Sequence, residues 1–385
     1  MRKLYWIGLA CLVVGVLIFS ISVLKGQQNR LPSSSLVAEI ETPVGFQRAK
    51  KPLEWEFPKD FGPHPEYQTE WWYYTGNLES EQGDRFGYQL TFFRRAVRPE
   101  GERIKRESAW ATEQIIMAHF ALSDIKAGEH YAFERFSRGA AELAGAESNP
   151  YQLWLDNWQV RQLSDGQYQL KAEQDGISLN LLLTDVKGPI LHGEEGYSQK
   201  GPDKGNASHY YSQTRLETSG SVQTGDVRYQ VSGLSWKDHE FSTGALSSGQ
   251  VGWDWFSIQL DDGSELMVFQ IRREDGSIDP YSSGTLINPD GEVIDLAKED
   301  FKIQVQDFWH SYESGAEYPS LWRLEVPEID LQLQVQPLIS DQEMNVSYNY
   351  WEGAVEVAGT AQGASISGSG YAELTGYAAS IEGEF

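Results

Sequence analysis

The chain has few residues that bind metals or form cross-links. Its 385 residues include one cysteine, Cys11, which lies in an apolar run near the N-terminus. A single cysteine cannot form an intrachain disulfide or a thiolate metal site. The seven histidines are scattered and lack the His-x-x-x-His spacing of a helical zinc site. We therefore expect no metal, and a fold that depends on its apolar core.

Positive charge is also scarce. The sequence has 31 Lys and Arg residues against 56 Asp and Glu residues, which gives a formal net charge of −25. Nucleic-acid binding requires Lys and Arg to neutralise the phosphates, and an acidic surface repels nucleic acid. We expect no nucleic-acid partner, and solubility is the simplest role of the acidic surface.

Several catalytic motifs are missing. The sequence has no Gly-x-Ser-x-Gly motif, so the serine of an α/β-hydrolase is unsupported. It also has no phosphate-binding P-loop and no dinucleotide-binding fingerprint. Nucleotide and dinucleotide cofactors are therefore unsupported.

Long helical periodicity is absent after the N-terminal run, and the pattern favours strands. Apolar residues alternate over 85–92 and form a run of strand length over 115–122. His119, inside that run, is expected to be a hydrogen-bonded core histidine. Asp-Gly pairs, a strong hairpin signal, stand at 165–166, 175–176, 262–263, 275–276 and 290–291. We predict an all-β fold of barrel or sandwich type, with 188–205 as a loop over one end of the first domain.

The N-terminus carries the longest apolar run. Arg2 and Lys3 precede a run from Leu4 to Leu24, which is about one bilayer crossing in length. Basic residues before such a run favour export of the chain on its C-terminal side. Residues 1–25 are predicted to be a signal anchor, or alternatively a cleaved signal peptide. The protein is thus expected to be exported, and either membrane-anchored through this segment or periplasmic or secreted. Residues 26–52 are predicted to be a linker, followed by domains at 53–243 and 244–385.

Acidic residues and aromatic rings gather in three clusters. The first is Asp238-His239-Glu240, with Trp236 and Phe241 beside it. On a regular strand Asp238 and Glu240 point one way and His239 the other, so a bulge or strand end is needed for both faces to meet one cavity. The cluster is either a hydrogen-bonded polar spot or an acid–base site. If the strand is regular and His239 points away, Asp254 or Glu70 becomes the better acid.

The other two clusters show the same alternation. In Trp253-Asp254-Trp255 the two indoles share a face and Asp254 takes the other. In the run 70–74, Glu70, Trp72 and Tyr74 share one face, and Trp71 and Tyr73 share the opposite face. Each ring alone is explained by core packing. Three such clusters in one chain favour an apolar cavity that contains an acid.

An acid in an aromatic cavity suits a particular chemistry. Protonation of an isolated alkene requires a neutral carboxylic acid, exclusion of water, and rings that stabilise a carbocation through cation–π attraction. Water held by a second polar group can then add. Aromatic walls with few acids suit this reaction better than peptide or phosphate chemistry.

Linked motifs from residue 55 to the C-terminus resemble one known family. The motifs are Pro63–Leu78, Gly196–Pro202, Ala207–Ser212, Ser235–Phe256, Pro280–Thr285, Tyr350–Gly353 and Gly370–Tyr377. Together they resemble the AttH / carotenoid 1,2-hydratase (CrtC-like) family of two-domain lipocalin-like proteins.

The resemblance implies two packed lipocalin-like β-barrels and, in one branch, cofactor-free addition of water to a polyene. It implies that His239 holds water and that Asp238 or Asp254 donates the proton. It also implies an aromatic substrate-binding wall, to which we assign Trp71, Trp72, Tyr73, Tyr210, Tyr211, Trp236, Trp253 and Trp255.

Three functions remain open on these grounds. The first is a hydratase, isomerase or cyclase that acts on an apolar polyene or terpenoid. The second is a non-catalytic carrier for an apolar molecule such as a polyene, terpenoid or lipid, in which the same rings form only a binding pocket. The third, a secreted hydrolase, rests on the habitual label of the family alone.

Overall fold

The structure, a computed structural model, describes residues 45–102, 108, 111–244 and 247–380. These residues form strands joined by turns and three short 3-10 helices: η1 (Lys59–Phe61), η2 (Glu100–Glu102) and η3 (Pro327–Ile329). The predicted all-β class is confirmed. The predicted anchor and the first part of the predicted linker lie outside the described residues. Within the described part of the chain, no helix is long and apolar enough to cross a membrane.

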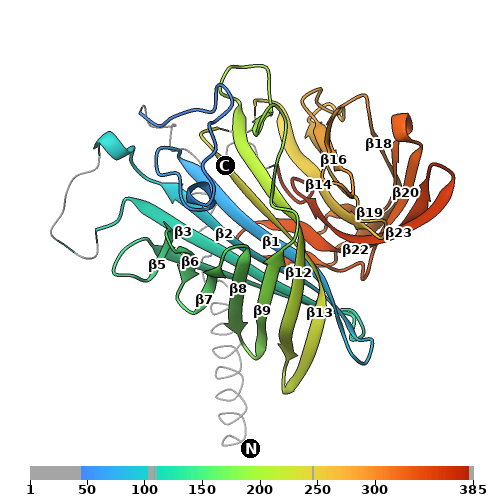
Figure 1. Cartoon of the computed structure of the whole chain (residues 1–385), viewed down its shortest axis with the longest axis horizontal. Coiled ribbons are helices and arrows are strands. Elements are labelled where there is room, and N and C mark those ends of the chain that lie inside the picture. Colours follow the sequence, from blue (N-terminus) through green and yellow to red (C-terminus); the bar gives the residue numbers. More distant parts are fainter. Residues whose placement is uncertain (1–44, 103–107, 109–110, 245–246, 381–385) are drawn as a thin grey trace, which may run out of the picture. The chain divides into compact units, whose positions relative to one another are not determined.

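The first sheet contains the strands before residue 243 that the structure describes. Its path is β4-β3-β2-β1-β13-β12-β9-β8-β7-β6-β5, with β10 and β11 paired to β12 (Figure 1). The bounds are β1 (Thr69–Ser80), β2 (Arg85–Ala96), β3 (Gln114–Asp124), β4 (Glu129–Arg138), β5 (Ala144–Ser148), β6 (Tyr151–Leu155), β7 (Trp158–Ser164), β8 (Gln167–Gln174), β9 (Ile177–Asp185), β10 (Pro189–Leu191), β11 (Tyr197–Gln199), β12 (Ala207–Thr224) and β13 (Val227–Ser242).

The second sheet contains the described strands nearer the C-terminus. Its path is β17-β16-β15-β14-β23-β22-β20-β19-β18, with β21 paired to β22. The bounds are β14 (Gln250–Leu260), β15 (Glu265–Arg273), β16 (Ser283–Ile287), β17 (Val293–Ala297), β18 (Lys302–His310), β19 (Glu317–Val326), β20 (Leu331–Pro337), β21 (Glu343–Asn345), β22 (Asn349–Ala361) and β23 (Ala364–Leu374).

The two barrel-like sheets share one topology. In each, the first strand pairs antiparallel with the last, β1 with β13 and β14 with β23. From each first strand, consecutive hairpins lead to one edge of the sheet, through β1-β2-β3-β4 and β14-β15-β16-β17. From each last strand, strands of decreasing number lead to the opposite edge. The sequence shows no close repeat between the halves, so the similarity lies in strand order alone.

The hairpin signals of the sequence mark real turns. All five glycines of the Asp-Gly pairs have positive φ, from 67° at Gly166 to 88° at Gly263 and Gly291. Glycine tolerates this left-handed region because it has no Cβ. The Asp-Gly turns at 165–166, 175–176 and 262–263 join β7 to β8, β8 to β9 and β14 to β15.

Alternation shows which sheet faces meet solvent. In β20, the buried residues Leu331, Leu333, Val335 and Pro337 alternate with three exposed glutamines. In contrast, every residue of β13 from Ser235 to Ser242 is buried. A strand buried on both faces packs against two layers. One face of β13 meets the interior of the first sheet, and the other meets the second sheet.

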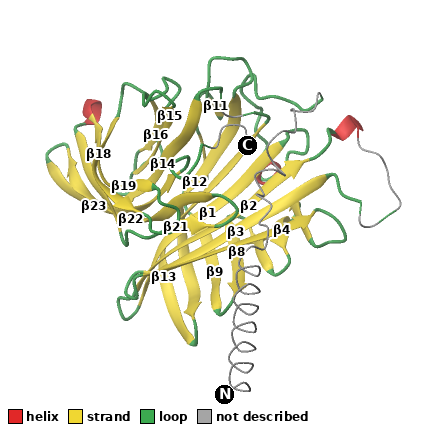
Figure 2. Ribbon diagram, turned by 180° about the vertical axis from the view of Figure 1, so that it is seen from behind, coloured by secondary structure: helices red, strands yellow, loops and turns green. Residues whose placement is uncertain are grey.

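The apolar core has separate parts. One buried cluster fills the interior of the first sheet and includes Trp72, Tyr74 and Tyr211. A second fills the interior of the second sheet and includes Phe256 and Trp322. A third lies between the sheets and is built from both, with Tyr73, Tyr210, Trp236, Trp255 and Phe269 among its members. Figure 2 shows the sheets from behind, with β1, β12 and β14 near their junction.

Hydrogen bonds tie the two sheets together. Asn77 Nδ2 donates to the Gly370 carbonyl at 2.9 Å, and Gln259 Nε2 donates to the Thr214 carbonyl at 2.7 Å. His119 is buried, with its ring nitrogens 2.8 Å from Tyr350 Oη and 3.1 Å from Glu134 Oε1. The prediction of a hydrogen-bonded core histidine is confirmed, although one of its partners lies in the other sheet.

The segment 188–205 differs from its prediction as a loop over one end of the first domain. It contains β10 and β11, which pair with β12, and it reaches the second sheet, where His192 Nδ1 lies 2.9 Å from Thr285 Oγ1. Lys187, just before it, binds Glu265 of β15 at 2.6 Å. The sequence did not predict β10 and β11, because a strand of three residues is too short to show alternation and the segment is rich in Gly and Pro.

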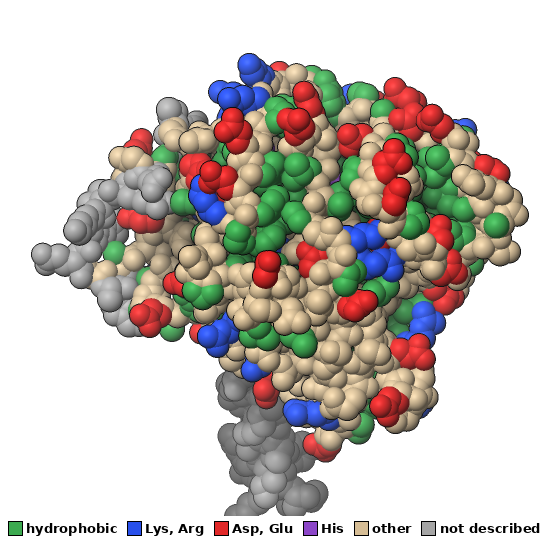
Figure 3. Space-filling model, viewed as in Figure 1, with side chains coloured by type: hydrophobic (Ala, Val, Ile, Leu, Met, Phe, Trp, Pro, Cys, Tyr) green, Lys and Arg blue, Asp and Glu red, His purple; other side chains and the backbone are tan. Residues whose placement is uncertain are grey.

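The acidic side chains expected to keep the protein soluble are spread over the face seen in Figure 3.

Candidate active site

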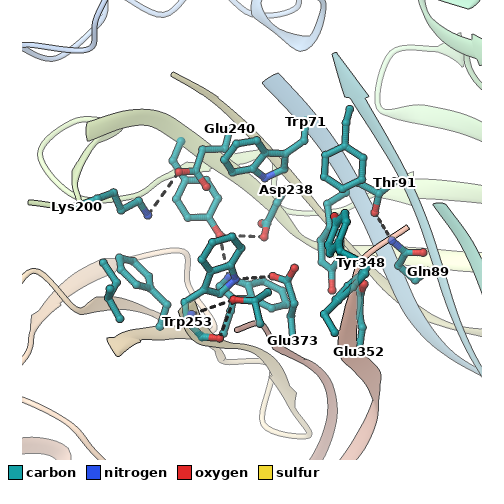
Figure 4. A pocket seen from close by; sticks show the side chains of 18 residues that line it. Trp71, Gln89, Thr91, Lys200, Asp238, Glu240, Trp253, Tyr348, Glu352 and Glu373 are labelled. Atoms are coloured by element: carbon teal, nitrogen blue, oxygen red, sulfur yellow. Dashed lines mark hydrogen bonds and ion pairs between the residues drawn. The ribbon is translucent and has the colours of Figure 1, made fainter. Parts of the chain in front are cut away.

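A cavity lies at the junction of the two sheets, in the third apolar cluster (Figure 4). The space that the centre of a water-sized sphere can reach in it is about 90 Å³. Eighteen residues line it. They are Trp71, Tyr73, Gln89, Thr91, Phe93, Lys200, Tyr210, Asp238, Glu240, Trp253, Trp255, Phe269, Ile271, Tyr348, Tyr350, Glu352, Glu373 and Thr375.

Strand alternation decides which members of the three sequence clusters reach this cavity. Trp71 and Tyr73 of β1 line it, as do Asp238 of β13 and Trp253 and Trp255 of β14. Neighbouring residues on the same strands point into the sheet interiors instead. The cavity therefore takes one face of each cluster, and half of its lining residues are aromatic.

Among the acids that line the cavity, Asp238 accepts the most side-chain hydrogen bonds. Its Oδ1 accepts hydrogen bonds from Trp236 Nε1 at 2.6 Å and from the Ser212 hydroxyl. Its Oδ2 accepts a hydrogen bond from Tyr210 Oη at 2.9 Å, and Tyr210 Oη in turn accepts from Trp255 Nε1 at 3.1 Å. Trp236 does not line the cavity but supports Asp238 from behind. These contacts fix the orientation of the carboxyl group.

Burial opposes these donors in setting the charge of Asp238. Removal from water disfavours the carboxylate and, together with the nearby Glu240, outweighs the three hydrogen bonds. The pKa of Asp238 rises to about 7. Near neutral pH this group therefore exists in both the acid and the carboxylate form, which a proton-transfer group requires.

Ser212 and His192 extend the contacts of Asp238. His192 Nε2 lies 2.6 Å from Ser212 Oγ, and its Nδ1 lies 2.9 Å from Thr285 Oγ1 of the second sheet. Burial lowers the pKa of His192 to about 3, so the ring is neutral. The Ser212 hydroxyl can donate to the Asp238 carboxylate or, when Asp238 is protonated, to His192. The same contacts thus accommodate both protonation states.

Two further carboxyl groups enter the cavity from the second sheet. Glu373 Oε2 accepts a hydrogen bond from Trp253 Nε1 at 2.8 Å, and burial raises its pKa to about 7. Glu352 is 1% exposed, and burial raises its pKa well above the ordinary value. Figure 4 shows Glu373 beside Trp253, and Glu352 further from Lys200.

Lys200 supplies the positive charge of the cavity wall. Its Nζ lies 3.5 Å from Glu240 Oε1 and 3.9 Å from the centroid of the Phe269 ring. Burial lowers the pKa of Lys200, although Glu240 opposes this shift. Among the lining residues, one cation thus faces four carboxyl groups: Asp238, Glu240, Glu352 and Glu373.

His239 and Glu70 lie on the opposite face, inside the first sheet. His239 Nε2 is 2.8 Å from Glu70 Oε1, and its Nδ1 is 3.0 Å from Tyr211 Oη. Arg94 Nε donates to Glu70 Oε2 at 2.8 Å, and His64 Nδ1 is 2.9 Å from Oε1. Burial lowers the pKa of His239 to about 3, despite Glu70.

The predicted bulge at Asp238 and His239 is therefore wrong. β13 keeps an unbroken register with β1 from Ser242 to Val231. No bulge is needed, because both faces of β13 are buried and each side chain has its own environment. We expected Asp254 or Glu70 to be the better acid if the strand was regular. This expectation is also wrong, because Asp238 lines the cavity whereas Asp254 and Glu70 do not.

The remaining predicted residues face away from the cavity. Trp72 stacks on His239 at a ring distance of 4.8 Å, and Tyr211 contacts the same ring. Asp254 is buried in the second sheet, where it accepts hydrogen bonds from Arg272 Nε at 3.0 Å and Gln270 Nε2 at 2.7 Å. These three residues do not line the cavity.

One group of side chains in the described part of the chain has donor atoms close enough together to bind a metal. Atoms of His64, Glu70 and His239 lie within 4.8 Å of one another. Both Glu70 oxygens are already hydrogen-bonded, and Arg94 places a positive charge against one of them. The donor set therefore fits a buried ion network better than it fits a cation.

Several lining residues were not expected from the sequence. Glu352 and Glu373 each stand in an otherwise apolar strand segment, Trp351-Glu352-Gly353 and Ala372-Glu373-Leu374. A lone acid in an apolar strand is a usable signal of a buried site. Lys200 gave no such signal, because it lies in a segment that the sequence predicts to be a loop, and Gln89 is an ordinary polar residue in an alternating strand.

Comparison with known proteins agrees with this architecture. The crystal structure of an AttH protein from Nitrosomonas europaea is similar to this chain, with a TM-score of 0.77 and 36% identity, and the match covers 87% of this chain and 99% of that one. The kievitone hydratase of Nectria haematococca has TM-score 0.64 at 11% identity, covering 88% and 99%, which shows a shared fold.

A curated relative and a family model complete the comparison. The dehydratase asqC of Emericella nidulans is 21% identical over 216 residues, which is 53% of this chain and 60% of that protein. The match thus spans less than two thirds of that relative. The AttH-like family model matches residues 48–377. The chain belongs to the AttH-like family.

Proposed function

We propose that this protein is a cofactor-free hydratase or dehydratase that acts on an apolar polyene or terpenoid in the cavity between the sheets. The observation that carries the proposal is Asp238, a buried carboxyl group in an aromatic wall whose pKa is about 7. A dehydratase and a hydratase among the similar proteins support this reaction class.

In the hydration direction, neutral Asp238 gives its proton to one alkene carbon. The carbocation that develops on the neighbouring carbon is stabilised by the faces of Trp71, Trp253 and Trp255. A water molecule then adds through its oxygen, and ionised Glu373 takes the proton that this water loses. One C–H and one C–O bond form as the alkene π bond breaks. Dehydration runs through the same steps in reverse.

The acid and base assignments predict a bell-shaped pH profile for kcat/KM. Below pH 7 Glu373 becomes protonated and can no longer accept a proton. Above pH 7 Asp238 ionises and can no longer donate one. For a substrate that does not titrate, we expect a maximum near pH 7 and a loss of about tenfold per unit on either side. A profile that is flat from pH 5 to 9 would contradict these roles.

Removal of the Ser212 hydroxyl should shift one limb of this profile. The Ser212 hydrogen bond stabilises the Asp238 carboxylate, so Ser212→Ala raises the pKa of Asp238 further. We expect the alkaline limb to move to higher pH while the acidic limb stays in place. Ser208→Ala is the matched control, because Ser208 is buried on the same strand and its Oγ has no hydrogen-bond partner among the described residues. Equal shifts in both variants would exclude this positioning role.

The proposal is tested by incubating the protein in D₂O with a panel of acyclic and cyclic terpenes, carotenes and their tertiary alcohols. Mass spectrometry should detect a hydrate with one deuterium on carbon, which an Asp238→Asn variant does not form. If the protein binds panel members but converts none, the carrier function is favoured instead. That carrier would keep its affinity in Asp238→Asn and lose it in Trp253→Ala.

A further inference from the structure

The end of the cavity away from Lys200 contains buried polar groups without partners. Glu352 of β22 is 1% exposed, and neither carboxyl oxygen has a hydrogen-bond partner among the described residues. The hydroxyls of Tyr73 and Tyr350 lie near enough to this carboxyl group to lower its pKa, but neither makes a hydrogen bond of normal distance and angle with it. A buried polar group without a partner typically costs about 1–3 kcal/mol. The fold thus retains a group that destabilises it.

Other polar groups at this end share that condition. Among the described residues that line this end, the buried hydroxyl of Tyr73 and the amide oxygen of Gln89 also lack partners. Gln89 Nε2 donates to Thr91 Oγ1 at 2.5 Å, so the amide oxygen is the end of this side chain that lacks a partner. Figure 4 shows Gln89 and Glu352 on the same side of the cavity. Donors and acceptors are therefore both present.

Charge limits what these groups can bind. Four carboxyl groups and one lysine line the cavity, and that lysine is already paired with Glu240. A carboxylate or phosphate would be repelled and would lack a free cation. Burial raises the pKa of Glu352 well above its ordinary value, which favours the uncharged carboxyl group and makes it a poor counter-ion for an ammonium group. An uncharged oxygen fits both conditions.

We propose that Glu352, with Tyr73 and Gln89, forms a subsite that hydrogen-bonds an uncharged hydroxyl or carbonyl oxygen of the substrate. The substrate is then an oxygen-bearing apolar molecule and not a pure hydrocarbon. This inference rests on the proposed function only in placing the substrate in the same cavity. A hydrocarbon would leave every one of these groups buried without a partner.

The test measures binding and needs no turnover. Four probes of one carbon skeleton are titrated against tryptophan fluorescence, since Trp71, Trp253 and Trp255 line the cavity. They are geraniol, the hydrocarbon 2,6-dimethylocta-2,6-diene, geranic acid and geranylamine. We expect geraniol to bind about tenfold more tightly than the hydrocarbon, which corresponds to one hydrogen bond. The acid and the amine should bind more weakly than geraniol.

Variants assign the preference to Glu352. Glu352→Leu should abolish the preference for geraniol, leave the affinity for the hydrocarbon unchanged or improved, and raise Tm. Glu352→Gln should keep part of the preference. Glu356→Leu on the same strand is the control, because Glu356 is half exposed and pairs with Arg85 at the surface.

Three outcomes overturn the subsite: equal affinities of the wild type for alcohol and hydrocarbon, a preference that survives in Glu352→Leu, or tightest binding by the amine. Absence of binding by all four probes overturns it as well. Because Asp238→Asn should keep the preference, failure of the proposed reaction and failure of this subsite give different results.

Discussion

Replacement of Asp238 by asparagine is expected to lower kcat by about 10²–10⁴-fold while the protein stays folded and binds its substrate. The amide has nearly the same shape as the carboxyl group but cannot release a proton to an alkene carbon. Trp236, Ser212 and Tyr210, which contact Asp238, remain in place. The loss should therefore appear in kcat and only weakly in affinity.

The measurement is a comparison of single-turnover rates on whichever substrate of the terpene panel is converted. Asp254→Asn is the matched control, since Asp254 is also buried and acidic but contacts Arg272 and Gln270 away from the cavity. Its folded fraction should keep its rate within about tenfold. If Asp254→Asn loses activity and Asp238→Asn does not, the acid has been assigned to the wrong residue.

The second large effect is expected on stability, from Glu70→Gln. Glu70 is fully buried and faces Arg94, His64 and His239. Loss of its charge leaves Arg94 buried without its counter-ion, and breaking a buried pair in this way costs about 3–5 kcal/mol. Urea unfolding followed by circular dichroism measures the change. The added variant Arg94→Met should recover part of the loss, because it removes the stranded charge.

The Glu70 effect should depend on pH. Burial opposes a charge on His64, but Asp60 and Glu70 outweigh it and raise the pKa of His64 from 6.5 to about 9. A raised pKa contributes stability that is complete below pH 6.5 and is lost as pH rises through 9. The difference between wild type and Glu70→Gln should thus be larger at pH 6 than at pH 9.5. Glu356→Gln, which breaks the exposed pair with Arg85, should change stability by less than about 1 kcal/mol. A Glu70→Gln effect as small as this would contradict the network.

The sequence predicted the fold class and the faces of its key strands because both depend on local patterns. Asp-Gly turns and alternation predicted the hairpins. Strand geometry alone placed Trp71 and Tyr73 on one face and Trp72 on the other, as the structure has them. Alternation is a property of the backbone, so it survives whatever packs against the strand.

Contacts between the sheets could not be predicted in this way. From the sequence we predicted that all three clusters line one cavity. In the structure, Asp238 and His239 lie in two separate environments, one on each side of β13. Recognising this requires knowing that β13 is buried on both faces. The pairing of His192 with Ser212 and the position of Lys200 likewise depend on a segment that was predicted to be a loop.

The proposed reaction depends most on Asp238 carrying a proton near neutral pH. Carbon-13 NMR of protein labelled at the aspartate carboxyl carbons, compared between wild type and Asp238→Asn, measures this pKa directly. We predict one signal with a midpoint near pH 7 that is missing from the variant. A spectrum in which the signal lost on substitution titrates near pH 4 would contradict the proposed acid.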